Sequence, residues 1–227
     1  MKTTLSFDGH AAALLLIDFQ EEQRHDPLYK VPGLSHILKN AARLLDAART
    51  QNHMVAHAAY IRDFTKVPPR PYEPTAADGK PTFSDAASAL TAICHEVAPR
   101  EGEPVITKND ASAFCEGDLA VRLKARGITW LVVSGVWTEA CVAATVRDAM
   151  AQGLRVLLVK DACGSATSAM HKTAVLNLAN RLYGGAVADT ERAVSLLKGG
   201  TAEVFVAERP VPLLFNFTDA AELYADL

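Results

Sequence analysis

Apolar residues follow two patterns along the chain: short continuous runs, and longer stretches in which they recur every three or four positions. The short runs are typical of buried strands, and the longer period is typical of helices that cover one face of a sheet. Six short runs predict strands at residues 12–17, 54–59, 104–107, 128–134, 155–159 and 186–188. Because predicted strands and helices alternate, we expect a mostly parallel sheet with helices on both faces.

Helices are predicted between these strands from the same pattern and from local end signals. They cover residues 34–48, 84–96, 119–126, 138–152, 168–183 and 190–198. Ser84 and Asp85 are candidate caps for the second helix, and Thr138 is the candidate N-cap of the fourth. Residues 62–83 contain five prolines. This stretch is therefore predicted to be a long surface loop.

The length of 227 residues favours one α/β domain, which we assign to residues 1–198. A tail of residues 199–227 follows it. Five large apolar residues lie close together in this tail: Val211, Leu213, Leu214, Phe215 and Phe217. A monomer would have to cover them by folding the tail back over its own sheet edge. We expect the tail to pack across a subunit boundary, and intramolecular packing is the alternative.

Composition narrows the partners and the location. The formal net charge of -3 supplies no broad basic field for nucleic acid or for an anionic membrane. The apolar run at residues 11–17 is far shorter than the roughly 20 residues of a membrane span. No CxxC pair occurs among the four cysteines. We therefore expect a cytoplasmic protein with neither a structural zinc site nor a disulfide framework.

Candidate chemistry lies at the carboxyl ends of the predicted strands, where ligands bind in open α/β sheets. Asp18 ends the first strand, Lys108 ends the third, and the fourth runs through a glycine turn into the helix that carries Cys141. In the common strand order 3-2-1-4-5-6, the first and third strands lie two steps apart, about 9 to 10 Å. A lysine side chain can span that distance.

This arrangement favours nucleophilic catalysis by Cys141. With Thr138 as N-cap, Cys141 is the third helical residue, where backbone N–H groups and the helix dipole favour a thiolate. Asp18 would serve as general base and Lys108 would stabilise the charges. The backbone N–H groups of Trp137 and Cys141 can face a developing oxyanion. Taken alone, each residue has a plainer explanation: Asp18 as a loop cap, Lys108 as a solvated lysine, and Cys141 as a small buried hydrophobe.

Four motifs resemble the isochorismatase-like cysteine hydrolases, a family that includes nicotinamidases, N-carbamoylsarcosine amidases, ureidoacrylate amidohydrolases and isochorismatases. The motifs are LLLIDFQ, ITKNDASAF, GVWTEACVAATVRDAMAQGLRVLLVKDAC and HKTAVLNLANRLYGGAVADTERAVSLL. The resemblance implies a single-domain, Rossmann-like three-layer sandwich with a six-stranded sheet. It also implies an Asp18, Lys108 and Cys141 triad, a cis peptide bond between Val136 and Trp137, and assembly into homodimers or homotetramers.

Two departures from the family's patterns narrow the expected reaction. The DxHxxH-type metal site of nicotinamidases is missing, and His53 and His57, about 13 Å apart on a regular strand, cannot share one ion. We therefore expect no metal and no cofactor. True isochorismatases cleave a vinyl ether without needing the cysteine, so Cys141 favours hydrolysis of a C–N bond.

The predicted function is hydrolysis of a small carboxamide or ureido compound through a covalent acyl-enzyme. Trp137, and with less support Phe114, are the candidate substrate-binding residues. Two alternatives stay open: vinyl-ether hydrolysis with Asp18 as acid, and a binding protein that kept the fold without turnover.

Overall fold

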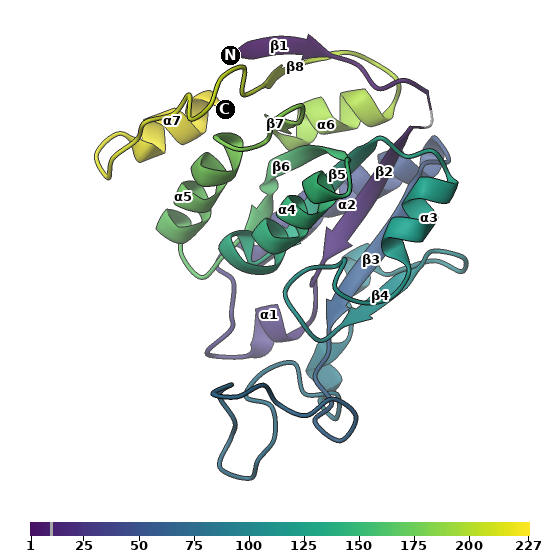
Figure 1. Ribbon diagram of the computed structural model, residues 1–227, viewed down its shortest axis with the longest axis vertical. Coiled ribbons are helices and arrows are strands. Elements are labelled where there is room, and N and C mark those ends of the chain that lie inside the picture. The colour runs from purple at the N-terminus through teal and green to yellow at the C-terminus, as the bar shows by residue number, and fades with distance from the viewer. Residues whose placement is uncertain (10) are drawn as a thin grey trace.

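The computed structural model describes residues 1–9 and 11–227 of the chain, and over this part eight strands form one sheet in the order β1-β8-β7-β6-β5-β2-β3-β4 (Figure 1). The strands are β1 (Lys2–Leu5), β2 (Ala12–Ile17), β3 (Met54–Tyr60), β4 (Val105–Lys108), β5 (Trp130–Val136), β6 (Arg155–Gly164), β7 (Ala186–Ala188) and β8 (Ala202–Phe205). From β2 to β7 all pairings are parallel. These six strands have the predicted order 3-2-1-4-5-6, so the α/β fold class is confirmed.

The predicted number of six strands is wrong, because β1 and β8 extend the sheet at the β7 edge. They pair with each other in antiparallel orientation, and β8 also pairs with β7. The sequence of β1, KTTL, is mostly exposed and has no apolar run. A short polar edge strand of this kind gives no periodicity signal, and it is recognised only from its hydrogen-bonded partner.

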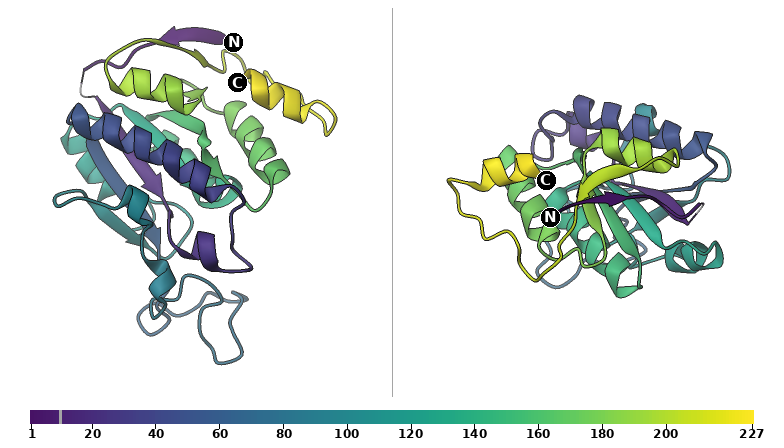
Figure 2. Two further views of the ribbon diagram at one scale, coloured as in Figure 1. Left: turned by 180° about the vertical axis from the view of Figure 1, so that it is seen from behind. Right: turned by 90° about the horizontal axis from the view of Figure 1, so that it is seen from above.

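Helices cover both faces of the sheet (Figures 1 and 2). One face carries α2 (Leu34–Thr50) and α6 (Thr190–Leu197), and the other carries α3 (Leu119–Ala125), α4 (Ala143–Ala151) and α5 (Ser168–Ala179). Strand β2 lies between the two layers: Ala12, Leu14 and Leu16 belong to one core, whereas Ala13, Leu15 and Ile17 belong to the other. Burial on both faces explains its continuous apolar sequence.

The predicted helix at residues 84–96 is wrong. Only two short 3-10 turns form there, Ala89–Thr91 and His95–Val97. Ser84 has a left-handed backbone with φ of 52°, and its N–H and hydroxyl both bind the Glu22 carboxylate instead of starting a helix. The preceding residues 62–83 contain no helix or strand, as the prolines predicted.

The C-terminal segment, residues 199–227, folds back on its own chain. Strand β8 joins the sheet, and α7 (Ala220–Asp226) packs against α5. Leu213, Phe215 and Leu223 pack against the second core, which lies between the sheet and helices α3, α4 and α5. Leu214 and Phe217 stay exposed. These contacts correspond to the intramolecular alternative considered for the tail. Among the described helices, none has both the length and the apolar character that crossing a membrane requires.

Candidate active site

Asp18 and Lys108 meet at the carboxyl ends of their strands. Asp18 follows β2 directly, in a left-handed conformation with φ of 53°, and its N–H donates to the Ala58 carbonyl. Lys108 is the last residue of β4, and its Nζ lies 2.8 Å from Asp18 Oδ2. The lysine crosses the end of β3, where Nζ lies 4.5 Å from the Tyr60 ring centroid. Both side chains are almost completely buried.

Cys141 comes from the turn that follows β5. The peptide bond between Val136 and Trp137 is cis, and residues Thr138–Val142 form one π-helical turn that continues into α4. The N-cap is Trp137 and not Thr138, because the Thr138 hydroxyl donates to the Gly164 carbonyl instead of capping the helix. Cys141 is therefore the fourth helical residue, one position later than predicted.

Gly135 permits the close approach of this turn to β2. A Cβ atom at this position would lie 2.5 Å from the carbonyl oxygen of Ile17, the residue before Asp18. Any side chain here would push β5 away from β2. The glycine before the turn therefore keeps the strand that leads to Cys141 against the strand that ends at Asp18.

The three side chains determine one another's protonation. Burial raises the pKa of the Cys141 thiol, and the Asp18 charge raises it further against the opposing effect of Lys108. Burial also raises the pKa of Asp18, while Lys108 and the thiol act to lower it. For Lys108, burial acts to lower the pKa, but Asp18 and Cys141 outweigh it and the pKa is raised. In the resting site Cys141 is therefore a protonated thiol and not the thiolate that a helix N-terminus would favour. It needs a base to act as a nucleophile.

A cavity of about 290 Å³ opens in front of Asp18 and Cys141. One side is a continuous series of aromatic rings. Tyr29 contacts both Phe83 and Trp137, at centroid distances of 5.3 and 6.5 Å, and Phe83 contacts Tyr60 at 5.4 Å. The polar lining residues besides Asp18 and Cys141 are Glu22, Gln23, Arg70, Ser84 and Asp110. Trp137 thus lies at the cavity, whereas Phe114 packs against the second core and is not part of this lining.

Helix α1 (Glu22–His25) holds two walls of the cavity in place, a role that the sequence patterns did not reveal. Gln23 Oε1 accepts a hydrogen bond of 2.7 Å from the Trp137 indole. The buried Glu22 carboxylate accepts from the Ser84 hydroxyl at 2.5 Å and from the Ser84 N–H at 2.9 Å. The Trp137 turn and the end of the long loop are therefore both attached to α1. The sequence offers one indication of this role, which is that Glu22 follows the strand-end residue Asp18 by four positions.

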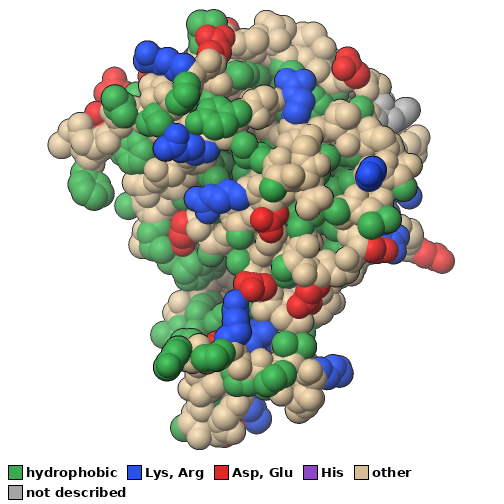
Figure 3. All heavy atoms as spheres, in the orientation of Figure 1, with side chains coloured by type: hydrophobic (Ala, Val, Ile, Leu, Met, Phe, Trp, Pro, Cys, Tyr) green, Lys and Arg blue, Asp and Glu red, His purple; other side chains and the backbone are tan. Residues whose placement is uncertain are grey.

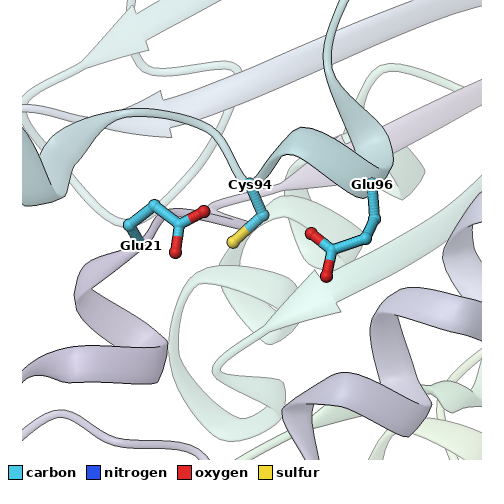
Figure 4. Close-up of side chains that lie close together, drawn as sticks. All are labelled: Glu21, Cys94 and Glu96. Atoms are coloured by element: carbon cyan, nitrogen blue, oxygen red, sulfur yellow. The ribbon is translucent and has the colours of Figure 1, made fainter.

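A cluster of potential metal ligands lies outside the cavity lining. Among the described residues, Glu21, Cys94 and Glu96 bring three possible ligand atoms within 4.8 Å of one another (Figure 4). Arg24 donates two hydrogen bonds to Glu96, at 2.8 and 2.9 Å, and lies 3.5 Å from Glu21. Burial raises the pKa of Cys94 to about 12, so this sulfur is a thiol. The guanidinium already compensates the carboxylates, and the group lies outside the cavity lining.

The histidines considered as a metal pair bind different partners. His53 Nε2 lies 2.8 Å from the Leu197 carbonyl oxygen, and His57 Nε2 lies 3.2 Å from Glu103 Oε2.

Comparisons with known proteins match most of the chain. A family model described as the isochorismatase domain matches residues 12–192. Maleamate amidohydrolase from Pseudomonas putida is 34% identical over 189 residues, which cover 79% of this chain and 84% of that protein. N-carbamoylsarcosine amidase from an Arthrobacter species is 28% identical, with 74% of this chain and 64% of that protein covered.

A crystal structure of an isochorismatase family protein from Desulfovibrio vulgaris superposes with a TM-score of 0.71. It is 25% identical and covers 83% of this chain and 98% of its own. The range that the family model matches contains Asp18, Lys108 and Cys141, whereas β1 and β8 lie outside this range.

The buried ion pair predicts a specific pattern of stability. Lys108→Met leaves the Asp18 carboxylate buried without its cation, so we expect the free energy of unfolding to fall by about 3–5 kcal/mol at neutral pH. Because protonation of Asp18 removes the unpaired charge, the loss should shrink as the pH is lowered. In the double variant Asp18→Asn/Lys108→Met neither charge remains, and the loss should be smaller than the sum of the two single losses. Urea unfolding of the four proteins measures this, and strict additivity would contradict the coupling.

Proposed function

The chain belongs to the isochorismatase family of hydrolases, and we propose that it cleaves the C–N bond of a small carboxamide or ureido compound with Cys141 as the nucleophile. The observation that carries the proposal is that the Cys141 thiol interacts with both members of the buried Asp18–Lys108 ion pair, and that Asp18 and Cys141 line a small cavity. The names of the two relatives described above, an amidohydrolase and an amidase, support the same reaction class.

The first half of the proposed reaction forms an acyl-enzyme. Asp18 takes the proton from the Cys141 thiol while the sulfur attacks the substrate carbonyl carbon. The backbone N–H groups of Trp137 and Cys141 donate to the resulting oxyanion. The C–N bond then breaks, Asp18 returns its proton to the departing nitrogen, and ammonia or an amine leaves behind a thioester on Cys141.

The second half releases the acyl group. Water attacks the thioester carbonyl and gives a proton to Asp18. The C–S bond breaks, Asp18 returns the proton to sulfur, and a carboxylic or carbamic acid leaves. Lys108 stays protonated throughout, because its neighbours raise its pKa. It keeps Asp18 available as an anion, and no cofactor takes part.

The cavity lining supports a small planar substrate that carries N–H groups. The volume of about 290 Å³ lies at the lower limit of ligand pockets, about 300–1,000 Å³. The rings of Tyr29, Phe83 and Trp137 offer flat apolar surface, and Trp137 is the proposed substrate-binding residue. The buried Glu22 carboxylate offers acceptor oxygens to N–H donors, which carboxamide and ureido groups both possess.

Vinyl-ether hydrolysis is the second candidate. The raised pKa of Asp18 favours it, because that reaction requires a protonated acid at this position.

A cytoplasmic location is part of the proposal, since Cys94, Cys115, Cys141 and Cys163 are all unpaired thiols.

Replacement of Cys141 distinguishes C–N bond hydrolysis from vinyl-ether hydrolysis. We expect Cys141→Ser to fold normally and to lose at least about 1,000-fold in kcat for ammonia release from small amides and ureido acids. Mass spectrometry of acid-quenched wild-type enzyme should show an acyl adduct on the peptide that contains Cys141. Cys115→Ser, which changes an exposed cysteine, is the matched control and should keep full activity. Amide turnover by Cys141→Ser at the wild-type rate would contradict the proposal, and retained activity on a vinyl ether alone would favour the second candidate.

Metal removal tests a different part of the proposal. Lys108 supplies the positive charge beside Asp18, so we expect dialysis against a chelator to leave kcat unchanged. A loss of activity that zinc or manganese restores would show that the mechanism is wrong on this point.

We also propose that the protein assembles as a homodimer or homotetramer. Leu214 and Phe217 in the C-terminal segment are 84% and 98% exposed, and apolar side chains lie at the surface on the side that carries α7 (Figure 3). Light scattering should give a mass of at least two chains, and Leu214→Ser/Phe217→Ser should lower it. Val121→Ser, at an exposed apolar position on α3, is the control. A single-chain mass for the wild type at micromolar concentration would refute the assembly.

A further inference from the structure

A chain of hydrogen bonds connects the C-terminal helix α7 with the turn that carries Cys141. The Tyr224 hydroxyl lies 3.0 Å from His171 Nε2, and His171 Nδ1 lies 2.8 Å from the Thr138 hydroxyl. The Thr138 hydroxyl lies 2.9 Å from the Gly164 carbonyl oxygen. This series of hydrogen bonds therefore starts on α7, passes through α5 and reaches the first residue of the π-helical turn.

The chemistry of the groups determines the direction of each bond. Thr138 has one hydroxyl proton and donates it to the Gly164 carbonyl, so it must accept from His171 Nδ1–H. A neutral imidazole that donates at Nδ1 accepts at Nε2. The Tyr224 hydroxyl is the donor there, because it lies 3.0 Å from Nε2 and 3.4 Å from its other acceptor, the Lys160 carbonyl. Burial lowers the pKa of His171 to about 4, which keeps the ring neutral at physiological pH. One tautomer thus satisfies every group in the chain.

Thr138 occupies a sensitive position in the site. It follows Trp137, the residue of the cis bond, and precedes Cys141 by three residues. Its side chain is completely buried. The Trp137 carbonyl accepts from the N–H groups of Ala140 and Val142, so the turn depends on the backbone conformation at these positions. A rotation at Thr138 would move the thiol relative to Asp18.

Helix α7 is anchored independently of the Tyr224 hydroxyl. Lys160 of β6, which is 8% exposed, donates from Nζ to the carbonyls of Tyr224 and Ala225, at 2.8 and 3.2 Å. The same Nζ lies 4.9 Å from the Tyr224 ring centroid, and the ring packs edge-on against His171 at 5.4 Å. These contacts hold the ring in place, so the hydroxyl can be removed without releasing the helix.

We propose that α7 is a positioning element of the active site, in which Tyr224 orients His171, and His171 fixes Thr138 and with it the turn that presents Cys141. Residues 199–227 lie beyond the residues that the family model matches, so this support for the nucleophile comes from outside the matched domain. The inference rests on the proposed function only in taking Cys141 as the nucleophile.

The reactivity of the Cys141 thiol tests the inference without a known substrate. Iodoacetamide is itself a small carboxamide, and mass spectrometry reports its reaction at Cys141 separately from that at the exposed Cys115. We expect Tyr224→Phe to lower the rate of Cys141 alkylation at neutral pH about three- to tenfold, and to shift its pH profile, because the thiol moves relative to the Asp18 and Lys108 charges that act on its pKa. Tyr183→Phe, the same change at an exposed tyrosine, should leave the rate unchanged. Urea unfolding of each variant establishes that it is folded.

A second variant tests the same link with α7 intact. His171→Asn keeps an N–H donor near Thr138 but is too short to reach Tyr224, so we expect alkylation to slow by a similar factor. Adding Tyr224→Phe to it should change nothing further. Alkylation at the wild-type rate in either folded single variant, or additive effects in the double variant, would overturn the inference. If the variants behave as expected but the wild type hydrolyses no amide or ureido compound, the proposed function fails and the positioning role stands.

Discussion

The ion pair between Asp18 and Lys108 is the constraint on which the rest of the site depends. Both charges are removed from water, which costs several kcal/mol per ion unless the partner is held in good geometry. The sheet supplies that geometry. Strands β2 and β4 each end at the same edge with β3 between them, and Tyr60 at the end of β3 lies beneath the lysine ammonium. A different strand order would leave each charge buried without its partner.

The position of Cys141 depends on a second set of contacts, which acts through the backbone. Gly135 lets β5 lie against the end of β2, and the cis bond after Val136 begins the turn. Gln23 on α1 then holds the Trp137 indole from one side, while Thr138 is tied to Gly164 on the other. None of these groups needs to react with a substrate. Together they keep the Cys141 thiol close to the Asp18 carboxylate, which forms an ion pair with Lys108.

The sequence patterns predicted the part of this architecture that depends on periodicity. Apolar runs predict the six parallel strands, and the common doubly wound arrangement predicts their order. The three candidate residues follow from the rule that the carboxyl ends of such strands share one edge. The wrong predictions concern segments whose structure depends on tertiary contacts. The KTTL strand forms because β8 is beside it, and residues 84–96 form no long helix because Glu22 takes the Ser84 N–H and hydroxyl. The aromatic wall comes partly from a proline-rich loop whose path has no local signal.

The raised pKa values of Asp18 and Cys141 look unfavourable for nucleophilic attack, yet they are consistent with the proposed reaction. In the resting site, Lys108 is positive and one negative charge resides on Asp18. When the proton moves from sulfur to Asp18, that charge moves to sulfur, and attack moves it on to the carbonyl oxygen. The site stays electrically neutral at each stage, so burial disfavours every stage to a similar degree and raises no separate barrier between them. Lys108 compensates one charge that changes its location, and this explains why a single buried cation can serve both halves of the reaction.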